Sequence, residues 1–424
     1  MRADQELESS VRYYGPRFPA SFASARGSEI VAEDGRRIID FLSACGALNY
    51  GHNHPRLKRA VADHLEGDGL LAALDLDTPA RRDFMRAFER VVLAPRGLDH
   101  RIQFTGPTGT NAVEAALKLA RKVTGRTTVV AFSNAFHGVT LGALAMSGGR
   151  GVRAASRALL HGVHRLPFEG YQGASAEDLL RYERQVADPS GGLEPPAAFI
   201  VETVQGEGGL NVASTRWLRA LAEVAKRLGA LLIVDDVQAG CGRTGRFFSF
   251  ERAGIEPDIV CLAKSLSGIG LPMAIALVRP GIDLWAPGEH NGTFRGNALA
   301  FVAATEALAL WEEGLVEDAA ARRAEEIADW TRRLLARWPG RGLSARGLGM
   351  MSGVAFAEPG MADAVARRAF ELGVMIETAG PNDEVLKLFP ALTIDPATLA
   401  DGLGRIAAAV ADVLTAGEEV GLVA

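Results

Sequence analysis

Leu231-Leu-Ile-Val-Asp235-Asp-Val-Gln238 and, further along the chain, Asp258-Ile-Val-Cys-Leu-Ala-Lys264-Ser-Leu-Ser-Gly268 are the two stretches that decide the fold. Each contains a short apolar run that ends at a charged side chain. Apolar residues on consecutive positions, rather than alternating ones, predict strands of a parallel sheet covered on both faces. The first strand would end in the carboxylate of Asp235, and the second would open into a loop at the amine of Lys264. An amine at such a position suits imine formation with an aldehyde.

Two more apolar runs, at residues 127–132 and 197–202, extend the same pattern. Helix-like segments lie between or after these strands, at residues 111–124, 215–228 and 298–313. Strands that alternate with helices in this order predict α/β layering. We therefore expect a large domain in which a mostly parallel sheet lies between helices.

The two ends of the chain predict a second, smaller domain. Residues 29–39 have the pattern of a hairpin with Asp34-Gly35 at its turn. Near residue 320 the composition changes to an Ala/Arg/Glu-rich helix, and apolar runs follow at 350–356 and 384–389. A chain of 424 residues is also longer than one compact core usually holds. We predict an α+β domain built from both ends, with segment boundaries at residues 1–60, 61–318 and 319–424.

The composition excludes several classes of protein. The net charge is −5 and there is no long basic run, so nucleic acid is not an expected partner. The polar, acidic start shows no signal peptide, and no apolar stretch is long enough to span a membrane. Three widely spaced cysteines favour a reducing, cytoplasmic setting. The pairs His52/His54 and His161/His164 lack a third ligand, so we expect no metal site.

A glycine-containing turn, Gly106-Pro-Thr-Gly-Thr110, comes just before the helix-like segment at residue 111. Free amides and the dipole at the start of a helix favour an anion, and Thr108 and Thr110 add hydroxyl donors. The turn is therefore a candidate phosphate site, although an ordinary strand-to-helix loop has the same appearance. We expect Thr110 or Asn111 to cap this helix and Gly125 to end it.

Four side chains have both a cofactor interpretation and an ordinary one. Phe136 could stack on a flat ring or belong to the core. Asp235 would be costly as a buried, unpaired anion, so it would either pair with a protonated pyridine nitrogen or cap a helix. Gln238 could reach a ring hydroxyl or lie at the surface. Lys264 could be a neutral, buried nucleophile or a surface lysine that ends a strand. A lysine and an aspartate at the ends of two core strands are the anchors that a pyridoxal phosphate site needs.

Several motifs occur together, in one order and at one set of spacings. They are Gly106-Pro-Thr-Gly-Thr110, Phe136-His-Gly138, Glu202-Thr-Val-Gln-Gly-Glu-Gly-Gly209, Asp235-Asp-Val-Gln238, Gly242-Arg-Thr-Gly245, Pro257-Asp-Ile-Val260, Lys264 and Thr293-Phe-Arg-Gly-Asn297. In this combination the chain resembles the class III (subgroup II, ω-amino acid type) aminotransferases of pyridoxal phosphate fold type I. The resemblance runs from about Glu8 to about Leu414. It includes Glu377-Thr-Ala-Gly380, a signal of the branch that supplies 2,4-diaminobutyrate for ectoine synthesis.

The resemblance implies a set of roles at the cofactor. Lys264 would bind the aldehyde and move a proton, while Asp235 would pair with the pyridine nitrogen. It further implies that pyridoxal 5'-phosphate is the cofactor and that the protein is a homodimer, or a larger assembly, with the site at the interface. The residues implied at the cofactor are Thr108, Gly109, Thr110, Phe136, His137, Glu202, Asp235, Gln238, Lys264 and, from a second subunit, Thr293.

The resemblance also points to residues for the substrate. Family members commonly pair the glutamate at Glu207 with an arginine, and this chain has Lys387 at the arginine position. A lysine is a point charge and lacks the two-pronged geometry of arginine. Arg295 is a candidate clamp for a carboxylate, and Cys45 stands where relatives usually have glycine or alanine. The implied substrates are small amino acids and their oxo-acid or aldehyde partners.

The activity that the resemblance implies is transfer of the amino group of L-glutamate to L-aspartate 4-semialdehyde. The products would be 2-oxoglutarate and L-2,4-diaminobutyrate. The alternative is an enzyme of a specialised pathway that uses the same cofactor on another amino acid, by transamination of an ω-amine or by racemisation, elimination or carbon–carbon bond formation. A regulatory protein that only senses the cofactor would need a DNA-binding module, and the sequence contains no such segment.

Overall fold

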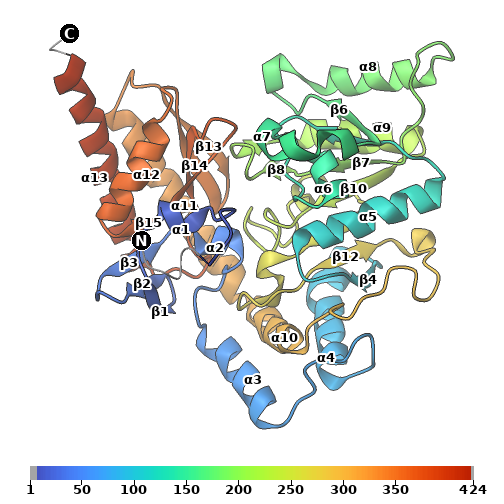
Figure 1. The fold of residues 1–424 in the computed structure, drawn as a ribbon, viewed down its shortest axis with the longest axis horizontal. Helices are drawn as coiled ribbons and strands as arrows, with labels where there is room; N and C mark the ends of the chain where they lie inside the picture. The colour runs from blue at the N-terminus through green and yellow to red at the C-terminus, as the bar shows by residue number, and fades with distance from the viewer. Residues whose placement is uncertain (1–6, 422–424) are drawn as a thin grey trace.

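A seven-stranded sheet forms the centre of the larger part of the molecule (Figure 1). The computed structural model describes residues 7–421. The order of the strands across the sheet is β4 (Arg101–Phe104), β12 (Ile275–Val278), β11 (Ile259–Leu262), β10 (Leu231–Asp235), β7 (Ala198–Val201), β5 (Val129–Phe132) and β6 (Val163–Leu166).

The predicted mostly parallel sheet is confirmed. The strand β10 pairs in parallel with β11 and β7, and β5 pairs in parallel with β7 and β6. The one exception among the described strands of this sheet is β12, which runs antiparallel to both of its neighbours, β11 and β4. Six strands therefore share one direction, and their carboxyl ends meet at one edge of the sheet.

Successive residues of the central strands belong to two different cores. Ile233 packs in the cluster that contains one face of α5 (Gly109–Thr124). Its neighbour Val234 packs in the cluster that contains α9 (Thr215–Arg227) and α10 (Ala298–Glu312). The sheet is thus buried on both faces, which explains why its strands are apolar on consecutive residues.

Other helices complete the larger part. Helices α3 (Pro55–Glu66) and α4 (Pro79–Phe88) pack against α10, and α8 (Ala176–Ala187) packs beside α9. The short helices of this part are α6 (Leu141–Met146) and α7 (Arg150–Arg153), whereas α1 (Tyr14–Arg17) and α2 (Ser43–Gly46) lie in the other part of the molecule (Figure 1). Single helical turns lie at Glu89–Leu93, Ala94–Arg96, Ala154–Leu159, Tyr171–Gly173, Glu251–Ala253, Lys264–Ser267 and Pro280–Ile282.

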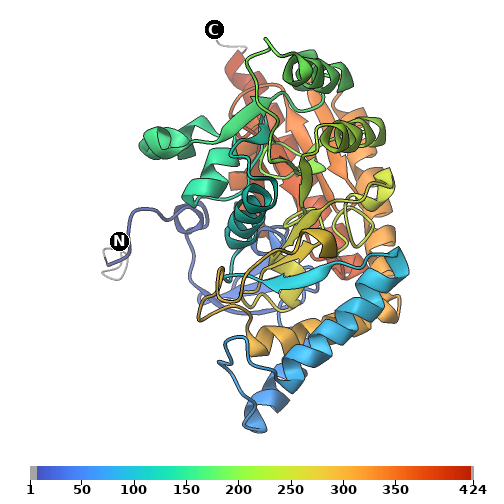
Figure 2. The ribbon, with the colours of Figure 1, turned by 90° about the vertical axis from the view of Figure 1, so that its right-hand side faces the viewer.

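The two ends of the chain lie together in a second part of the molecule (Figures 1 and 2). The expected hairpin is formed by β2 (Glu29–Ala32) and β3 (Arg37–Asp40), which join β1 (Phe22–Arg26) and the C-terminal strand β15 (Val374–Met375) in one sheet. A second sheet has the order β13 (Leu343–Leu348), β14 (Met351–Phe356), β17 (Val385–Leu388) and β16 (Glu377–Ala379). The helices of this part are α11 (Leu315–Arg337), α12 (Met361–Glu371) and α13 (Pro396–Gly421).

The start of α5 corrects one prediction. The helix begins at Gly109 with Thr108 as its cap, so the expected cap at Thr110 or Asn111 was wrong. Asn111 instead accepts a hydrogen bond at Oδ1 from the backbone amide of Thr108, at 3.2 Å. The expected end is confirmed, because Gly125 follows the helix with a φ of 68°.

Within residues 7–421, no helix is long and apolar enough to cross a membrane. Residues 1–6 of the acidic start lie outside the described part of the chain. The boundaries expected at residues 60 and 318 stay a prediction, since the sheets alone do not define where one domain ends. A further small hairpin, β8 (Val204–Gln205) with β9 (Asn211–Val212), lies next to the C-terminal sheet through β13.

Candidate active site

The carboxyl edge of the large sheet brings together charged residues that are far apart in the sequence. The strand β10 ends in Asp235, β7 is followed by Glu202, and β11 is followed by Ala263 and Lys264. Because these three strands are parallel neighbours, their end residues lie side by side. The geometry therefore agrees with the expectation that the amine and the carboxylate share one site.

Lys264 has an unusual backbone and an unpaired amine. Its φ is +51°, in the left-handed region that costs a residue with a side chain about 1–2 kcal/mol. Next to it, Ser265 Oγ donates to the carbonyl oxygen of Gly46 at 2.6 Å and so holds the strained turn against the N-terminal segment. Burial lowers the pKa of the Lys264 amine, and Glu207 partly opposes this. No residue of the described chain forms a hydrogen bond or ion pair with Lys264 Nζ, so the amine is available as a nucleophile.

Asp235 is held by a histidine. Its Oδ2 lies 2.7 Å from Nδ1 of His137, whose side chain is completely buried, and its Oδ1 accepts from the backbone amide of Val237 at 3.2 Å. A carboxylate can only accept, so Nδ1 of His137 carries the proton. The other ring nitrogen, Nε2, is buried and has no hydrogen-bond partner in the part of the chain that the structure describes. The ordinary interpretation of Asp235 as a helix cap was wrong, because turns rather than a helix follow β10.

Glu202 organises the loop that carries Phe136. Its Oε1 accepts from the Phe136 amide at 2.8 Å, and its Oε2 accepts from the Gly206 amide at 3.3 Å. Burial raises the pKa of Glu202 to about 7. Phe136 is 39% exposed, so it is not the core phenylalanine of the ordinary interpretation. It is available as a flat surface beside the sheet edge.

The start of α5 forms a tight cradle at the same edge. A Cβ atom on Gly109 would lie 2.8 Å from Cγ1 of Val237, so only glycine lets the helix start lie this close to the strand end. Oγ1 of Thr110 lies 2.7 Å from Oγ1 of Thr140, and Oγ1 of Thr108 donates to Asn111 at 2.8 Å. The backbone amides of the first helical turn therefore remain the main donors for an anion.

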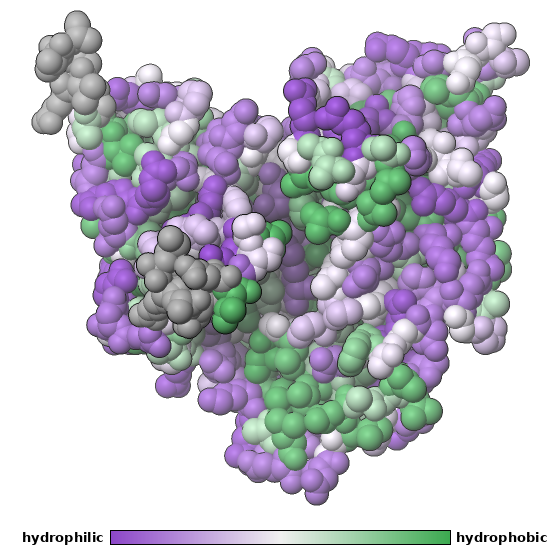
Figure 3. Space-filling model, in the orientation of Figure 1, coloured by the Kyte–Doolittle hydropathy of each residue, from purple (hydrophilic) through white to green (hydrophobic). Residues whose placement is uncertain are grey.

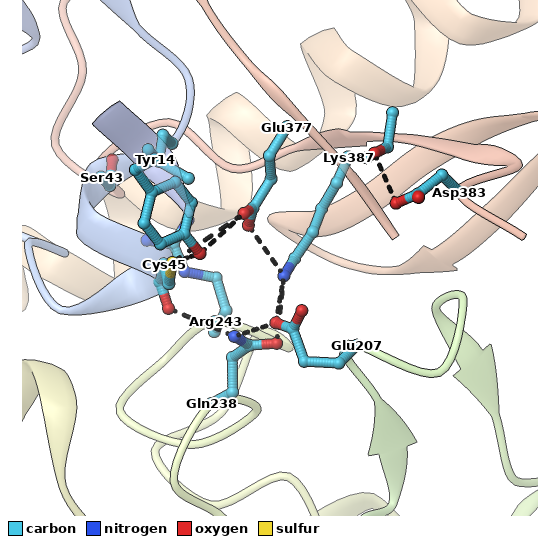
Figure 4. A network of polar contacts seen from close by, with 12 residues as sticks. Tyr14, Ser43, Cys45, Glu207, Gln238, Arg243, Glu377, Asp383 and Lys387 are labelled. Atoms are coloured by element: carbon cyan, nitrogen blue, oxygen red, sulfur yellow. Dashed lines mark hydrogen bonds and ion pairs between the residues drawn. The ribbon is translucent and has the colours of Figure 1, made fainter. Parts of the chain in front are cut away.

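A second cluster of polar residues joins the two parts of the molecule (Figure 4). Glu207 Oε1 accepts from Nζ of Lys387 at 2.9 Å and from Nε2 of Gln238 at 3.0 Å. Lys387 also forms an ion pair with Glu377 at 3.1 Å. Glu207, Lys387 and Glu377 all act on the charge of the Lys264 amine, which shows that the cluster faces the sheet edge.

Cys45 belongs to this cluster through an unusual turn. The three residues Ser43, Ala44 and Cys45 have φ values of 46°, 48° and 56°, so consecutive residues with side chains adopt the left-handed region. Oδ1 of Asp40 accepts from the amides of Leu42 and Ser43, each at 2.8 Å, and holds the turn. As a result, the backbone oxygen of Cys45 accepts from Gln238 at 3.2 Å. Strain of this kind is concentrated at functional sites, where surrounding contacts support it.

Two members of the cluster were given no role in the sequence analysis. The hydroxyl of Tyr14 donates to Oε2 of Glu377 at 3.2 Å and lies 2.6 Å from Cys45 Sγ. Glu377 is 2% exposed, a degree of burial that is rare for glutamate without a charged partner. The motif Glu377-Thr-Ala-Gly380 contains an acidic residue in an otherwise small and apolar strand, and this was the signal that could have indicated it.

Thr293 and Arg295 lie away from these clusters. Thr293 is exposed on the loop before α10. Arg295 donates to the backbone oxygen of Asn291 at 3.1 Å and lines a separate cavity of about 240 Å³ with Arg81 and Trp285. No hydrogen bond or ion pair joins Arg295 to Glu207 or Lys387 within the described chain.

Pyridoxal phosphate fits the residues gathered at the sheet edge. The cofactor has an aldehyde, a pyridine nitrogen and a phosphate. The unpartnered amine of Lys264 suits the aldehyde, and the fixed carboxylate of Asp235 suits the pyridine nitrogen. The start of α5 suits the phosphate, because Gly109 has no side chain to cover the backbone amides. Each of the three groups thus meets a side chain or helix end of suitable chemistry.

Comparisons with known proteins agree with this geometry. The family model "Aminotransferase class-III" matches residues 13–410. Among similar proteins, the diaminobutyrate–2-oxoglutarate transaminase of Bordetella parapertussis (strain 12822) is 51% identical over 411 residues, which cover 96% of this chain and 94% of the relative. That of Streptomyces anulatus is 52% identical over 408 residues, covering 96% of each.

Solved structures show the same fold. An ornithine aminotransferase from Toxoplasma gondii, crystallised with partial occupancy of pyridoxal phosphate at its active site, has a TM-score of 0.84 at 27% identity and covers 97% of this chain and 94% of its own. A transaminase from the marine bacterium Virgibacillus has a TM-score of 0.86 at 21% identity, covering 97% and 99%, and is a likeness of fold alone. With a family model that matches nearly the whole length and relatives that share half of the residues, the chain belongs to the class III aminotransferases, which depend on pyridoxal phosphate.

Proposed function

We propose that the protein transfers the amino group of L-glutamate to L-aspartate 4-semialdehyde, giving 2-oxoglutarate and L-2,4-diaminobutyrate. The similar diaminobutyrate–2-oxoglutarate transaminases support this, because they align with this chain over nearly their full length at about half identity. The observation that carries the proposal is the unpaired amine of Lys264 beside the cluster of Glu207, Gln238 and Lys387. An amine nucleophile next to a preformed carboxylate position suits amino transfer between amino acids.

At the cofactor end, we assign a role to each residue of the sheet edge. Lys264 would hold the aldehyde of pyridoxal phosphate and move a proton to and from the substrate carbon through Nζ. Asp235, oriented by His137, would hold the pyridine nitrogen protonated. When bound, the cofactor supplies an electron sink for the substrate bond that breaks. Phe136 would stack on the ring, and Glu202 would orient Phe136 through its backbone amide.

The phosphate would be held at the start of α5. Thr108 caps the helix, and Gly109 and Thr110 lie in its first turn, where backbone amides have no carbonyl partner within the helix. The helix dipole favours a dianion at this end. Gln238 was expected to reach a hydroxyl of the cofactor ring. Its side-chain amide instead donates to Glu207 and to the backbone oxygen of Cys45.

At the substrate end, Oε1 of Glu207 marks where a carboxylate is bound. It accepts hydrogen bonds from both Lys387 and Gln238. We propose that the carboxylate of glutamate takes this position when Glu207 turns away, and that Glu207 returns for the substrate whose terminal amine reacts. Glu207 can make such a movement because its side chain is 33% exposed, while Lys387 is completely buried.

A half-reaction screen tests the proposed function. The purified protein in its pyridoxal phosphate form is mixed in turn with glutamate, diaminobutyrate, ornithine and 4-aminobutyrate, and the visible spectrum is followed. We expect conversion to the pyridoxamine form with glutamate and diaminobutyrate, together with release of 2-oxoglutarate from glutamate. If neither of these two substrates converts the protein, the proposal is wrong. Spectral change without 2-oxoglutarate would favour a reaction other than transamination.

We also propose that the protein is a homodimer in a cytoplasmic, reducing setting. Leu70, Leu71, Leu74 and Leu76 are each more than half exposed, and Phe294 is 70% exposed. Asp75 and Arg295 line one cavity, so the two segments that carry these apolar residues lie side by side. Figure 3 shows hydrophobic side chains gathered over the lower part of this face, near α3 and α4. Contiguous exposed apolar surface of this kind favours a protein partner.

Sedimentation velocity checks the proposed assembly. The exposed loop of Thr293 carries Phe294 of this face, and the family resemblance implies that Thr293 of one copy reaches the cofactor site of the other. We expect a particle of at least twice the 44.9 kDa mass of the chain at micromolar concentration. A monomer under the same conditions would contradict the proposal.

A further inference from the structure

Lys387 is surrounded by oxygen atoms on three sides. Its Nζ donates to Glu207 Oε1 at 2.9 Å and to Gln238 Oε1 at 3.3 Å, and it lies 3.1 Å from Glu377 Oε1 (Figure 4). The ammonium group therefore makes two hydrogen bonds and one ion pair. Burial alone would lower the pKa of Lys387, but Glu207 and Glu377 outweigh it and raise the pKa. Lys387 therefore stays charged, between two carboxylates.

The two carboxylates are held very differently. Glu377 lies directly opposite Lys387 in the antiparallel pair of β16 and β17, and its side chain is 2% exposed. Tyr14 donates to its second oxygen at 3.2 Å. Glu207 lies on the loop between β8 and β9, flanked by Gly206, Gly208 and Gly209, and its side chain is 33% exposed. Glu377 is thus a fixed partner of Lys387, whereas the side chain of Glu207 can turn away from Lys387.

The negative charge on one oxygen of Glu377 is compensated by Lys387 alone. Within the described chain, Oε1 of Glu377 is buried and accepts no hydrogen bond, so the nearby ammonium charge is what stabilises it. The pair consequently remains together whether or not Glu207 is present. When Glu207 leaves, Lys387 and Glu377 form a neutral pair rather than a bare cation.

We propose that Glu377 is a positioning residue that sets how strongly this site holds a carboxylate, an inference that rests on the proposed function. It acts through Lys387, whose charge it neutralises permanently, so that any carboxylate at the Glu207 position is held weakly enough to exchange. Glu207 and the carboxylate of glutamate compete for one position, and the negative charge of Glu377 repels both alike. The specificity for a glutamate donor is therefore set by Lys387 together with three carboxylates, those of Glu207, Glu377 and the substrate, and not by one ion pair.

This arrangement predicts an effect of Glu377 that depends on Glu207. In the otherwise unchanged protein, Glu377→Gln should alter the glutamate KM by less than about threefold, because substrate and Glu207 gain equally from the lost repulsion. In a Glu207→Ala background the competitor is gone. There the same change should lower the glutamate KM by about tenfold or more, since a buried lysine would be left without a fixed counter-ion. The kcat for glutamate should change little in either comparison.

The experiment measures glutamate KM and kcat for the holoenzyme and for Glu377→Gln, Glu207→Ala and the double variant. Glu377→Asp keeps the charge and should not lower the KM in the Glu207→Ala background. Glu358→Gln, an exposed carboxylate elsewhere, serves as the control for net charge. If Glu377→Gln does not fold, Glu377→Met removes the same charge and should give the same result.

The outcomes separate this inference from the proposed function. If the unchanged protein is not converted by glutamate, the proposed function fails and the inference fails with it. If glutamate converts the unchanged protein but Glu377→Gln shifts the KM by the same factor in both backgrounds, Glu377 is only a structural ion-pair partner. That second result would overturn the inference and leave the proposed function intact.

Discussion

Lys264→Ala is expected to abolish the visible absorbance of the protein and to lower turnover by at least about 10³-fold, since positioned proton transfer alone contributes about 10²- to 10⁴-fold. The physical reason is that one amine does two tasks. It would hold the cofactor aldehyde, and it would move the substrate proton. The amine has no partner among the described residues, so its loss breaks no ion pair, and the variant should keep its fold.

The control for this change is Lys226→Ala. Lys226 is exposed near the end of α9, away from the carboxyl edge of the sheet. We expect the Lys226 variant to keep its spectrum and turnover, and both variants to melt within a few degrees of the parent protein. Full activity of the Lys264 variant, measured as release of 2-oxoglutarate, would contradict the assigned mechanism.

Asp235→Asn is expected to lower turnover by about 10²- to 10⁴-fold, which corresponds to the roughly 3–5 kcal/mol lost when one partner of a buried charge pair is removed. An asparagine cannot hold the pyridine nitrogen protonated, so the ring would draw electrons less strongly. The hydrogen bond with His137 would also be weakened, because a carboxylate holds an imidazole donor more strongly than an amide does. The measurements are kcat and the affinity for pyridoxal phosphate.

The neighbouring residue provides a matched control for Asp235. Asp236 is as deeply buried but faces the other way, where its Oδ2 accepts from the amide of Ser249 at 3.0 Å. Burial raises the pKa of Asp236 to about 7, so a neutral side chain costs less here than at an ordinary aspartate, and asparagine should be tolerated. Asp236→Asn should therefore keep kcat within a few-fold of the parent. Equal losses in the two variants would indicate a general packing defect instead of a role at the cofactor.

Four strands of the large sheet, β5, β7, β10 and β11, could be predicted because they carry a local signal. Ile233 and Val234 face different cores, so both positions are apolar, and the same holds along β5, β7 and β11. The end residues of these strands were equally readable, since a charge after an apolar run is visible in the sequence. The direction of β12 was not readable, because an apolar run has the same composition whether it runs parallel or antiparallel to its neighbours.

The cluster around Lys387 could be predicted only in part. The pairing of Glu207 with Lys387 followed from the family resemblance, and the contact at 2.9 Å agrees with it. The contact between Tyr14 and Glu377 could not be derived, because residues from the N-terminal arm and from β16 meet only in the folded molecule. The role of Arg295 stays a prediction: its charge is visible in the sequence, and the fold places it on the loop before α10, beside Asn291.

Reduction of the purified protein with borohydride tests the central claim most directly. The treatment fixes the cofactor to the lysine that holds it, and digestion followed by mass spectrometry identifies that lysine. The amine at the end of β11 is the only one assigned to the cofactor here, so the label should be found on the peptide that contains Lys264. A label on another lysine, or no label in a protein that is active as a transaminase, would contradict the account.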